Sequence, residues 1–593
     1  MKPKSLLPRL TALILVLCLL VSPAAALTTE QARELLAEFY VDPVPQEVLD
    51  QPTIQDMLDA LGDPYTEYLS AEEYQALLAS MSGPVIGGIG VTSTATGQGL
   101  EVQEVLEGGA AQAAGMQAGD ILIAVDGQSI VGLTAEEASA LIRGEAGTQV
   151  QIAYLRAGRR LSATLTRGSI TLPSTTGTLL EGSVGYIECE TWGHDTVDCF
   201  RDAITSLDGE VGCWLVDLRG NTGGYTDAAV DAAGLFCGEG TQAALRFRGG
   251  DLLHPDGYRY EILQSQEDTI TDKPVVVLVD GYSASSSEVF ASILRDYSRA
   301  VIVGGRTFGK GLAQSLWDEE VLPDYFSEGD CLKLTTARFY SPIGNNNHII
   351  GVIPHFPVDD PQEAAELSLA LAQSFAQFPE NWYDLTIELL EAQFSAAAFE
   401  DTADHAYEDA ITALAAYGLV SGKDDGLYHP DDTLTRAELA QMLCNILHCP
   451  VPQTGPDYTD VAADAWYAPA VTALSTLRLT EGTGEGRYDP DRVLTRQELF
   501  TVAARLSRWL NDDLDALERD TAELTWYIQI LDGYADWAKS SVWLLSCALE
   551  GPEGTTVNLL WDEPEYIDPT APATRGEAAE VLYGILSYLS ILP

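Results

Sequence analysis

Side chains that could serve in nucleophilic catalysis lie close together between residues 283 and 314. The serine-rich segment Ser283–Glu288 follows an apolar, mostly β-branched run, 275–279, and precedes a helical pattern of apolar residues. Lys310 lies in a glycine-rich segment after the next β-branched run. A helix N-terminus offers free N–H groups and partial positive charge to an oxyanion. The arrangement suits a serine nucleophile with a lysine base.

Two other interpretations compete for this stretch. The simplest is a serine-rich helix cap followed by a surface lysine, which is the commonest outcome for such a pattern. The second is a phosphate-binding loop, because Gly304, Gly309 and Lys310 fit G-x-x-x-x-G-K. That pattern fails at Gly311, where serine or threonine should hold magnesium.

The whole stretch resembles the carboxy-terminal processing peptidases, also called tail-specific proteases. Ser283–Glu288, Thr307–Gly311 and Gln314 stand in register with the motifs of that family. The resemblance implies that Ser285 is the nucleophile, Lys310 the base and Gln314 its neighbour in the catalytic centre. One departure is Ser286, where alanine is usual, and its small side chain should be tolerated.

The same resemblance extends to the oxyanion hole and predicts the state of the base. The segment Asp217–Gly224 is similar to the D-L-R-x-N-x-G-G motif, so the backbone N–H groups of Gly223, Gly224 and Ser286 are the candidates for oxyanion binding. A lysine base must be neutral, which requires its pKa to fall from about 10.4 to roughly 7–8. Burial can supply this shift provided that no carboxylate lies close to Lys310.

Length, charge and the N-terminus indicate an exported multidomain protein. The chain has 593 residues, with 32 Lys and Arg against 89 Asp and Glu, a net charge of −57. Such acidity disfavours nucleic acid and anionic membrane surfaces as partners. Basic residues, an apolar run over 10–21 and Ala24–Ala26 form the layout of a signal peptide, 1–26. The eight cysteines outside it show no disulfide framework, and no Cys/His cluster has zinc spacing, so we expect buried thiols, no metal and no cofactor.

A segment before the predicted peptidase core carries a peptide-binding motif. Residues 84–168 resemble a PDZ domain, on the strength of Gly87–Val91 and of Ala114–Ile121. The resemblance implies that Gly88, Ile89, Gly90 and Val91 hold the carboxylate of a peptide C-terminus while the peptide adds as a strand to an open edge. The segment 61–69 resembles the L-D-P-Y-T/S segment that precedes the PDZ domain in the same family, and the resemblance implies a packing role for it.

An internal repeat follows the predicted peptidase core. The T-R-x-E element occurs at Thr435, Thr495 and Thr574, after an x-D-P or x-P-D turn, and the third copy is degenerate. The copies resemble S-layer homology motifs, which bind cell-wall polysaccharide. Because the repeats are acidic, binding needs a specific pocket, and Arg436 and Arg496 are the candidates for the wall polymer. The alternative is that both arginines only support packing between helices.

These observations predict the following organisation. The fold is multidomain, with an α/β peptidase core of the crotonase/ClpP-like class, an inserted β-rich PDZ domain, N-terminal helices and all-α repeats. The predicted boundaries are 1–26 signal peptide, 27–83 helical segment, 84–168 PDZ domain, 169–378 peptidase core, and repeats at 397–450, 455–510 and 528–593.

The expected function is that of a secreted serine endopeptidase held at the cell wall. It would cleave protein or peptide substrates recognised by their free C-termini, and the repeats would act as a passive tether. The sequence leaves homo-oligomerisation open. The alternative is a wall-anchored peptide-binding scaffold with an inactive peptidase domain.

Overall fold

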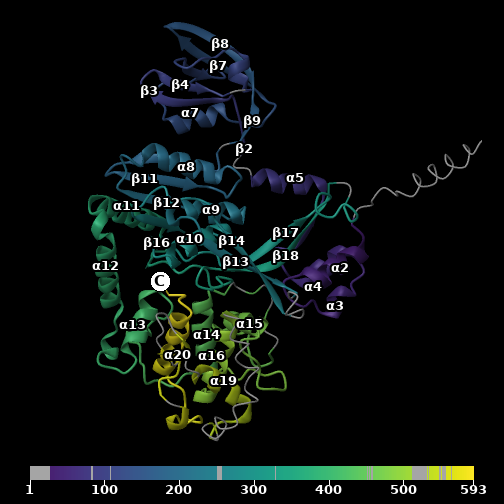
Figure 1. The fold of residues 1–593 in the computed structure, drawn as a ribbon, viewed down its shortest axis with the longest axis vertical. Coiled ribbons are helices and arrows are strands. Elements are labelled where there is room, and N and C mark those ends of the chain that lie inside the picture. Colours follow the sequence, from purple (N-terminus) through teal and green to yellow (C-terminus); the bar gives the residue numbers. More distant parts are fainter. Residues whose placement is uncertain are drawn as a thin grey trace, which may run out of the picture.

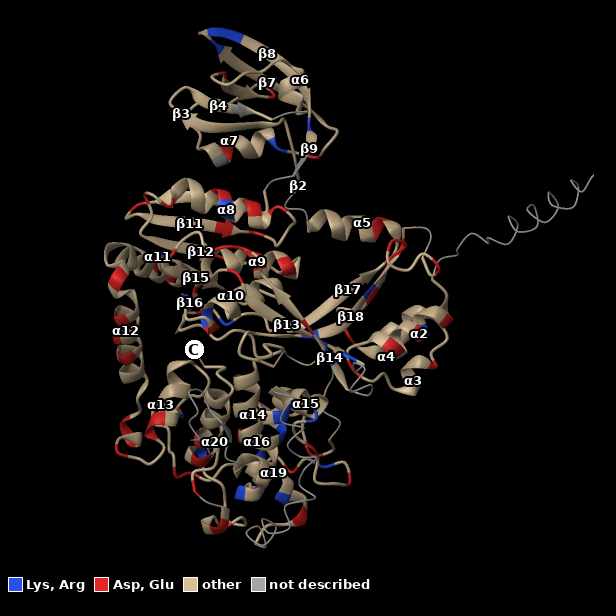
Figure 2. Ribbon diagram, in the orientation of Figure 1, with Lys and Arg blue, Asp and Glu red and all other residues tan. Residues whose placement is uncertain are grey.

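The computed structural model describes residues 27–81, 85–106, 108–171, 173–249, 257–326, 329–449, 452, 455, 458–510 and, with short gaps, 531–592. The predicted signal peptide lies outside these residues. The β-rich unit and the C-terminal helices occupy opposite ends of the long axis, with the α/β core between them (Figure 1). Acidic side chains are spread over every part of the ribbon in Figure 2. None of the helices described here has both the length and the apolar character that a membrane crossing needs.

The core is built on a six-stranded sheet in the order β10-β11-β12-β15-β16-β19. In this sheet β11, β12, β15, β16 and β19 run parallel to one another, and β10 pairs antiparallel with β11. Their bounds are Thr175–Leu180 for β10, Val184–Cys189 for β11, Cys213–Asp217 for β12, Val275–Val279 for β15, Ala300–Gly304 for β16 and Phe356–Pro357 for β19. The strands β12, β15 and β16 are buried along their whole length, as their continuous apolar runs predict.

Helices cover both faces of this sheet. Val275, Val277 and Val279 pack into one hydrophobic cluster with α8, α9 and α10, whereas Val276 and Leu278 pack into another with α11. The helix bounds are Thr196–Leu207 for α8, Thr226–Cys237 for α9, Ser286–Asp296 for α10 and Pro361–Gln377 for α11. The alternation follows from the period of two along a strand. The sheet therefore holds the serine-rich turn between β15 and α10 rigidly from both sides.

A second sheet closes the other side of the core. Strand β18 is its centre and pairs with β1, β13 and β17, while β14 pairs with β13. Its bounds are Glu67–Leu69 for β1, Gln242–Arg248 for β13, Tyr258–Gln264 for β14, Leu312–Trp317 for β17 and Cys331–Tyr340 for β18. The N-terminal helices pack on β18 and are α2 (Thr29–Phe39), α3 (Gln46–Leu49) and α4 (Ile54–Leu61), followed by α5 (Ala71–Ser80). The helical expectation for this segment was wrong at β1, which pairing with β18 makes a strand.

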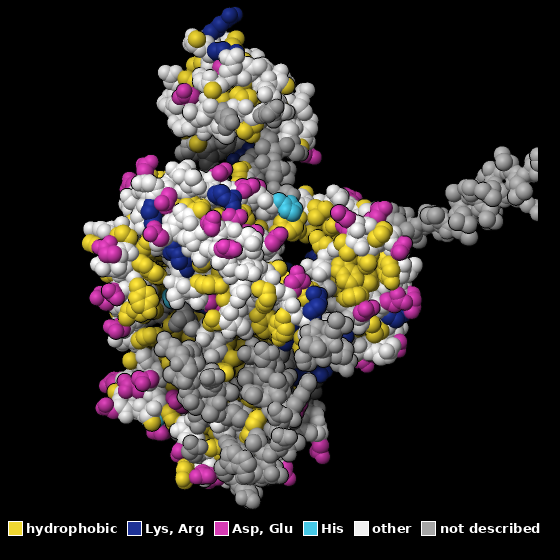
Figure 3. All heavy atoms as spheres, viewed as in Figure 1, with side chains coloured by type: hydrophobic (Ala, Val, Ile, Leu, Met, Phe, Trp, Pro, Cys, Tyr) yellow, Lys and Arg dark blue, Asp and Glu magenta, His cyan; other side chains and the backbone are white. Residues whose placement is uncertain are grey.

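The β-rich unit has its own core. Its sheet runs β3-β4-β5-β7-β8, with β6 paired to β5, and β3 is an edge strand. The bounds are Val91–Thr96 for β3, Gly99–Val105 for β4, Ile121–Val125 for β5, Gln128–Ser129 for β6, Gln149–Arg156 for β7 and Arg159–Thr166 for β8, with helices α6 (Ala110–Ala113) and α7 (Ala135–Ile142). The stem is formed by β2 (Val85–Gly88) and β9 (Gly168–Thr171), which pair antiparallel. Figures 1 and 3 show this unit as a separate mass above the core.

The C-terminal third begins with α12 (Trp382–Ala397) and continues into three helical copies. Their main helices are α13 (Glu408–Ala416), α14 (Arg436–Leu447), α15 (Ala468–Thr476), α16 (Arg496–Leu510), α19 (Asp536–Ser546) and α20 (Arg575–Tyr588). Thr435 and Thr574 cap α14 and α20 with reciprocal bonds to Glu438 and Glu577, as the T-R-x-E spacing predicts. The all-α expectation was wrong at one place, since β20 (Leu549–Glu550) and β21 (Thr556–Val557) pair antiparallel.

The three copies close into a ring. The N–H of Leu434 donates to the carbonyl of Ala573, that of Leu494 to Leu434, and that of Ala573 to Leu494, each at 2.9 Å. The degenerate third copy thus supplies one of three equivalent contacts. We call the unit formed by the described residues between 398 and 592 the repeat ring.

Candidate active site

Ser285 lies at the N-terminal end of α10 with an unusual backbone. Its φ is +56° and its ψ is −115°, a region that residues other than glycine rarely adopt. The preceding turn is fixed by Ser283, whose hydroxyl donates to the carbonyl of Leu218 (2.8 Å) and accepts from the N–H of Asp280 (3.0 Å). Such strain persists only where surrounding contacts hold it. The turn places the Ser285 side chain, which is 8% exposed, in a large pocket.

Glu288 connects this turn to the loop that carries Lys310. Its carboxylate accepts from the N–H of Ser285 (2.9 Å) and of Lys310 (2.8 Å) through Oε2, and from the Thr307 hydroxyl (2.6 Å) and the Gly309 N–H (2.7 Å) through Oε1. Burial raises the pKa of Glu288, while these four hydrogen bonds act in the opposite direction. One buried side chain therefore holds both halves of the candidate catalytic pair, a role that the sequence analysis did not assign.

Lys310 is held in a state suited to a base. The pKa of Lys310 is lowered from 10.5 to about 8, mainly by burial and also by the charge of Lys333. The carboxylates of Glu288, Asp63 and Glu67 act in the opposite direction. The condition that no carboxylate lies near Lys310 was therefore wrong, because three contribute, but burial outweighs them. Lys333 itself pairs with Glu67 at 2.5 Å, and the Lys310 Nζ lies 4.9 Å from the centre of the Tyr65 ring.

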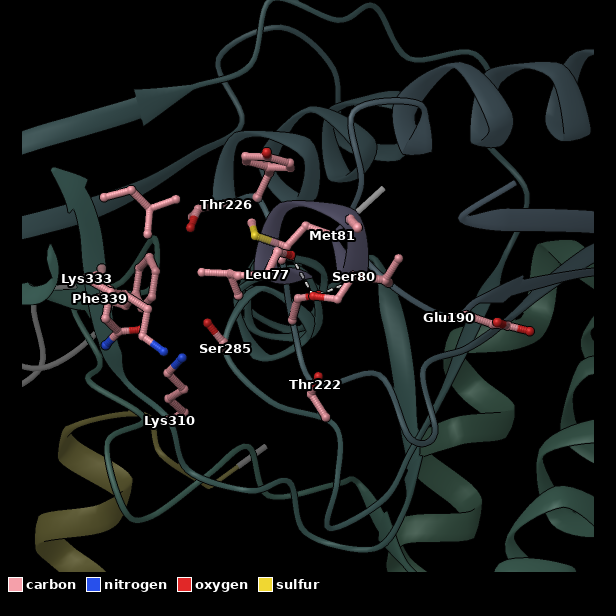
Figure 4. A pocket seen from close by; sticks show the side chains of 18 residues that line it. Leu77, Ser80, Met81, Glu190, Thr222, Thr226, Ser285, Lys310, Lys333 and Phe339 are labelled. Carbon is pink, nitrogen blue, oxygen red and sulfur yellow. Dashed lines mark hydrogen bonds between the residues drawn. The ribbon is translucent and has the colours of Figure 1, made fainter. Parts of the chain in front are cut away.

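The pocket brings the predicted residues together. It has a volume of about 910 Å³ and is lined by Ser285, Lys310, Gln314, Gly223 and Gly224. Lys310 and Ser285 both extend into this space in Figure 4. Gln314 lies on β17, beside a register shift, and its Nε2 donates to the hydroxyl of Thr335 (3.3 Å).

The end of α5 forms one wall of the pocket. Leu77, Ser80 and Met81 line it and lie over the serine in Figure 4. These residues carry no motif, so the sequence offered no signal that they would reach the site.

The three oxyanion candidates differ in their hydrogen bonds. The N–H of Gly223 donates to Asn221 Oδ1 at 3.0 Å and is thus engaged within its own loop. No hydrogen bond from the N–H of Gly224 or of Ser286 is found within the described part of the chain. A side chain at Gly223 would stand 2.8 Å from the Cβ of Ser285 and 3.3 Å from its hydroxyl. Glycine at position 223 therefore keeps the space beside Ser285 open. The backbone N–H groups of Gly224 and Ser286 remain available to donate to an oxyanion.

Ser286 also has a role that the sequence did not indicate. Its hydroxyl donates to the carbonyl of Gly224 at 2.9 Å, which ties the start of α10 to the glycine loop. The indole of Trp192 donates to the hydroxyl of Ser287 at 2.9 Å, and that hydroxyl donates to the carbonyl of Asn221 at 3.0 Å. The departure from alanine at 286 therefore adds a contact beside the site.

The predicted carboxylate loop lies in the β-rich unit, away from Ser285. Gly88, Ile89 and Gly90 line a separate cavity of about 500 Å³. Gly90 has φ +78°, and a Cβ there would lie 2.9 Å from the Cα of Gly109. Val91 begins the edge strand β3.

The candidate wall-binding arginines both bond within the repeat ring. Arg436 donates to the carbonyls of Tyr488 (2.7 Å) and Glu481 (2.6 Å), and Arg496 pairs with the buried carboxylate of Glu577 at 2.5 Å. Arg575, which the sequence analysis left without a role, makes the matching contact in the third copy, to the carbonyl of Tyr428 (3.0 Å). These contacts join neighbouring copies.

Comparison with known proteins gives matches to all three kinds of segment. The sequence matches peptidase family S41 over residues 183–358, the PDZ domain over 101–156 and the S-layer homology domain over 398–440 and 457–500. It is 33% identical over 337 residues to the carboxyl-terminal-processing protease of Synechocystis sp., covering 55% of this chain and 75% of that protein. The chain belongs to the carboxyl-terminal-processing proteases of peptidase family S41 and is a serine-type peptidase.

Two further relatives extend this comparison. A probable CtpA-like serine protease of Staphylococcus aureus is 29% identical over 338 residues, covering 56% of this chain and 64% of that protein. Among solved structures, the photosystem II D1 C-terminal processing protease is 29% identical, with a TM-score of 0.36, and the match covers 57% of this chain and 96% of that one. The chain thus spans about two thirds of the Staphylococcus relative.

Proposed function

We propose that the chain is an exported serine endopeptidase, associated with the cell wall, in which Ser285 is the nucleophile, Lys310 the general base and Gln314 a polar neighbour. The observation that carries the proposal is that a strained serine at a helix N-terminus and a lysine with a pKa of about 8 line one pocket. With this pKa, the lysine is neutral in about a tenth of the molecules at pH 7 and in about half of them at pH 8. The unperturbed amine would be almost fully protonated there.

The mechanism follows from these positions. Neutral Lys310 accepts the proton of the Ser285 hydroxyl as its oxygen attacks the scissile carbonyl carbon. The carbonyl oxygen becomes an oxyanion, for which the N–H groups of Gly224 and Ser286 are the donors we favour over that of Gly223. Lys310 then returns the proton to the leaving amine, and water hydrolyses the acyl-enzyme by the same route.

Substrate capture is assigned to the PDZ unit. Peptide C-termini would bind at the Gly88, Ile89, Gly90 and Val91 loop and add as a strand to the free edge of β3. The edge position of β3 and the cavity beside the loop support this proposal. The domain boundaries given by the sequence, and the crotonase/ClpP-like class of the core, remain part of the proposal.

The S-layer homology repeats associate the protein with the cell surface, and we propose cell-wall polysaccharide as their ligand. Arg436 and Arg496 remain the candidate contacts, although both already bond to neighbouring copies. Sedimentation of Arg436→Ala and Arg496→Ala proteins with purified, protein-free walls tests this role. A loss of thermal stability with unchanged sedimentation would make the arginines structural only.

The experiment for the catalytic claim compares wild-type and Ser285→Ala full-length protein on a fluorogenic peptide. We expect turnover by the wild type and none above background by the variant. Equal rates would remove Ser285 from the mechanism. The alternative of an inactive scaffold is not favoured, because Ser285, Lys310 and Gln314 are all present in one pocket.

A further inference from the structure

The loop that carries Lys310 rests on a second segment, residues 341–355, which joins β18 to β19. The N–H of Ile349 donates to the carbonyl of Gly309 at 2.7 Å, and the N–H of Val352 donates to the Thr307 hydroxyl at 2.6 Å. Contact is tight, since a side chain at Gly311 would lie 2.4 Å from the backbone nitrogen of His348. This supporting segment therefore determines where the Lys310 loop lies.

The supporting segment is packed, on its other side, into the repeat ring. Ile350 and Ile353 are 0% and 1% exposed and belong to the same hydrophobic cluster as the helices of the ring. Asn345 Nδ2 donates to the carbonyl of Ser590 at 2.8 Å, and the His348 ring stacks on Trp509 with centres 6.3 Å apart. The ring and the peptidase core thus share buried surface at this segment.

Arg306 makes a direct link from the base loop to the ring. It lies between β16 and Lys310, and its guanidinium donates to the carbonyls of Asn445 (3.0 Å) and Ile446 in the last turn of α14. Carbonyls at a helix C-terminus lack partners within the helix and carry partial negative charge, so a cation there is stabilised. Arg306 thus fixes the start of the Lys310 loop against α14.

We propose that the repeat ring is a positioning element of the peptidase, in which Arg306 and the supporting segment hold the Lys310 loop against Ser285. The proposal rests on the catalytic pair proposed above. It replaces the expectation of a passive tether, because the ring would set the turnover rate as well as the location of the enzyme. Arg306 is a positioning residue, since it acts through the loop and not on the substrate.

Several polar residues of the supporting segment fit this assignment. Asn345 bonds to the ring, Asn346 accepts the N–H of His348 (2.8 Å), and Asn347 donates to the Ser292 hydroxyl of α10 (2.6 Å). His355 accepts the N–H of Ile302 on β16 through Nδ1 at 3.0 Å. No role for these positions is evident from the sequence, and each makes a structural contact at or beside the interface.

The test compares four full-length proteins: wild type, Arg306→Gln, Arg306→Lys and Arg505→Gln. Arg505 is the matched control, because its ion pair with Glu481 (3.2 Å) lies within the ring. We expect Arg306→Gln to lower kcat by about tenfold to a hundredfold with little change in KM, as small displacements of a catalytic group do. Arg306→Lys should recover part of the loss, and Arg505→Gln should match the wild type.

Amide hydrogen exchange gives a readout that does not depend on activity. The N–H groups of Gly309 and Lys310 donate to Glu288, so their exchange reports on the Glu288 clamp, which is the set of hydrogen bonds by which Glu288 holds the Lys310 loop. We expect faster exchange at both amides in Arg306→Gln and unchanged exchange in Arg505→Gln. Wild-type rates and wild-type exchange in Arg306→Gln would overturn the proposal.

A second variant covers the case in which Arg306→Gln does not fold. Asn345→Ala removes a contact to Ser590 without touching the Lys310 loop, and we expect the same faster exchange at Gly309 and Lys310. Unchanged exchange there would also overturn the proposal. If the wild type showed no Ser285-dependent turnover, while the Arg306 and Asn345 variants still exchanged faster at Gly309 and Lys310, the proposed function would be contradicted and the positioning role of the ring would stand.

Discussion

The PDZ unit and the repeat ring are attached to the same core in different ways. In the part of the chain that the structure describes, the hydrophobic cluster of the PDZ unit contains only residues between Ile89 and Leu165, and a two-stranded stem joins the unit to the core. The cluster of the ring includes Ile350 and Ile353 from the core, and Arg306 bonds directly to α14. The two units lie at opposite ends of the molecule (Figure 1).

The difference in attachment suits the PDZ unit and the repeat ring to different roles. A unit with its own core can move on its stem and present a peptide, because few buried contacts are lost when it shifts. A unit that shares a core with the base loop instead contributes to the geometry of that loop. We therefore expect changes on the PDZ side to alter substrate capture, and changes on the ring side to alter turnover and the stability of the core.

The largest effect is expected at the base loop itself. Lys310→Arg should lower kcat by about 10²- to 10⁴-fold, because arginine stays protonated and cannot accept the serine proton. The effect should be the same for substrates with and without a free C-terminus. Steady-state kinetics on both substrates measure it, with Lys423→Arg on the ring surface as control. Retained activity of Lys310→Arg would refute the Ser/Lys mechanism.

Paired core substitutions test the comparison directly. Ile353→Ala in the shared cluster and Ile152→Ala in the PDZ core each remove a side chain that is at most 1% exposed, at a cost of about 2–5 kcal/mol. We expect Ile353→Ala to lower the melting temperature of core and ring together and to reduce kcat. Ile152→Ala should destabilise the PDZ unit alone and leave unchanged the rate at which short peptides that do not bind the PDZ unit are cleaved. Calorimetry with parallel assays separates the two, and identical behaviour of the variants would abolish the distinction.

Capture by the PDZ unit should depend on the free carboxylate of the substrate. A charged group contributes about 1.5–3 kcal/mol per hydrogen bond, so amidation of the C-terminus should lower kcat/KM by about tenfold or more. The variant Gly90→Val should remove this preference, because φ is +78° and the Cβ would meet Gly109. Equal rates for free and amidated substrates in the wild type would mean that this loop does not read chain ends.

The smallest effect concerns pH and the interface of core and ring. Burial lowers the pKa of His348 from 6.5 to about 4 and that of His355 to about 3. Both are neutral in the folded protein, so their contribution to stability is present above pH 6.5 and is lost as pH falls toward the folded pKa.

Between pH 7.5 and 6 the loss should be less than about 1 kcal/mol per histidine. Chemical unfolding of wild type and His355→Gln at these pH values measures the difference. We expect a weaker pH dependence in the variant. An unchanged dependence would show that His355 does not carry a buried, neutral state.

The sequence predicted the parts of the site that local pattern determines. The apolar run at 275–279 predicted a strand buried on both faces, and the structure has one there. The resemblance to the peptidase family implied that Ser285, Lys310 and Gln314 share one site, and all three line one pocket. The Glu288 clamp left a signal in the S-x-x-E spacing from Ser285, which is that of a capping box. The contribution of Lys333 and the wall formed by α5 left none, because distant pairing of strands and helices sets them.

The packing of the repeat ring against the core could likewise not be predicted from the sequence. Arg306 and Ile353 look like ordinary loop residues, and only the closed ring shows which surface meets them. Asn345 and His355 carry no assigned role in the sequence, because their contacts to Ser590 and Ile302 depend on the tertiary fold.

The role of Lys310 as the base is tested most directly by the pH dependence of Ser285 phosphonylation by a fluorophosphonate, in which the serine oxygen bonds to phosphorus and fluoride leaves. Because burial lowers the pKa of Lys310 to about 8, the rate should rise with pH to a plateau, with its midpoint near 8. Lys310→Arg should abolish labelling, and Ser285→Ala should prevent it altogether. A pH-independent rate in the wild type, or wild-type labelling of Lys310→Arg, would contradict a neutral Lys310 acting as the base for Ser285.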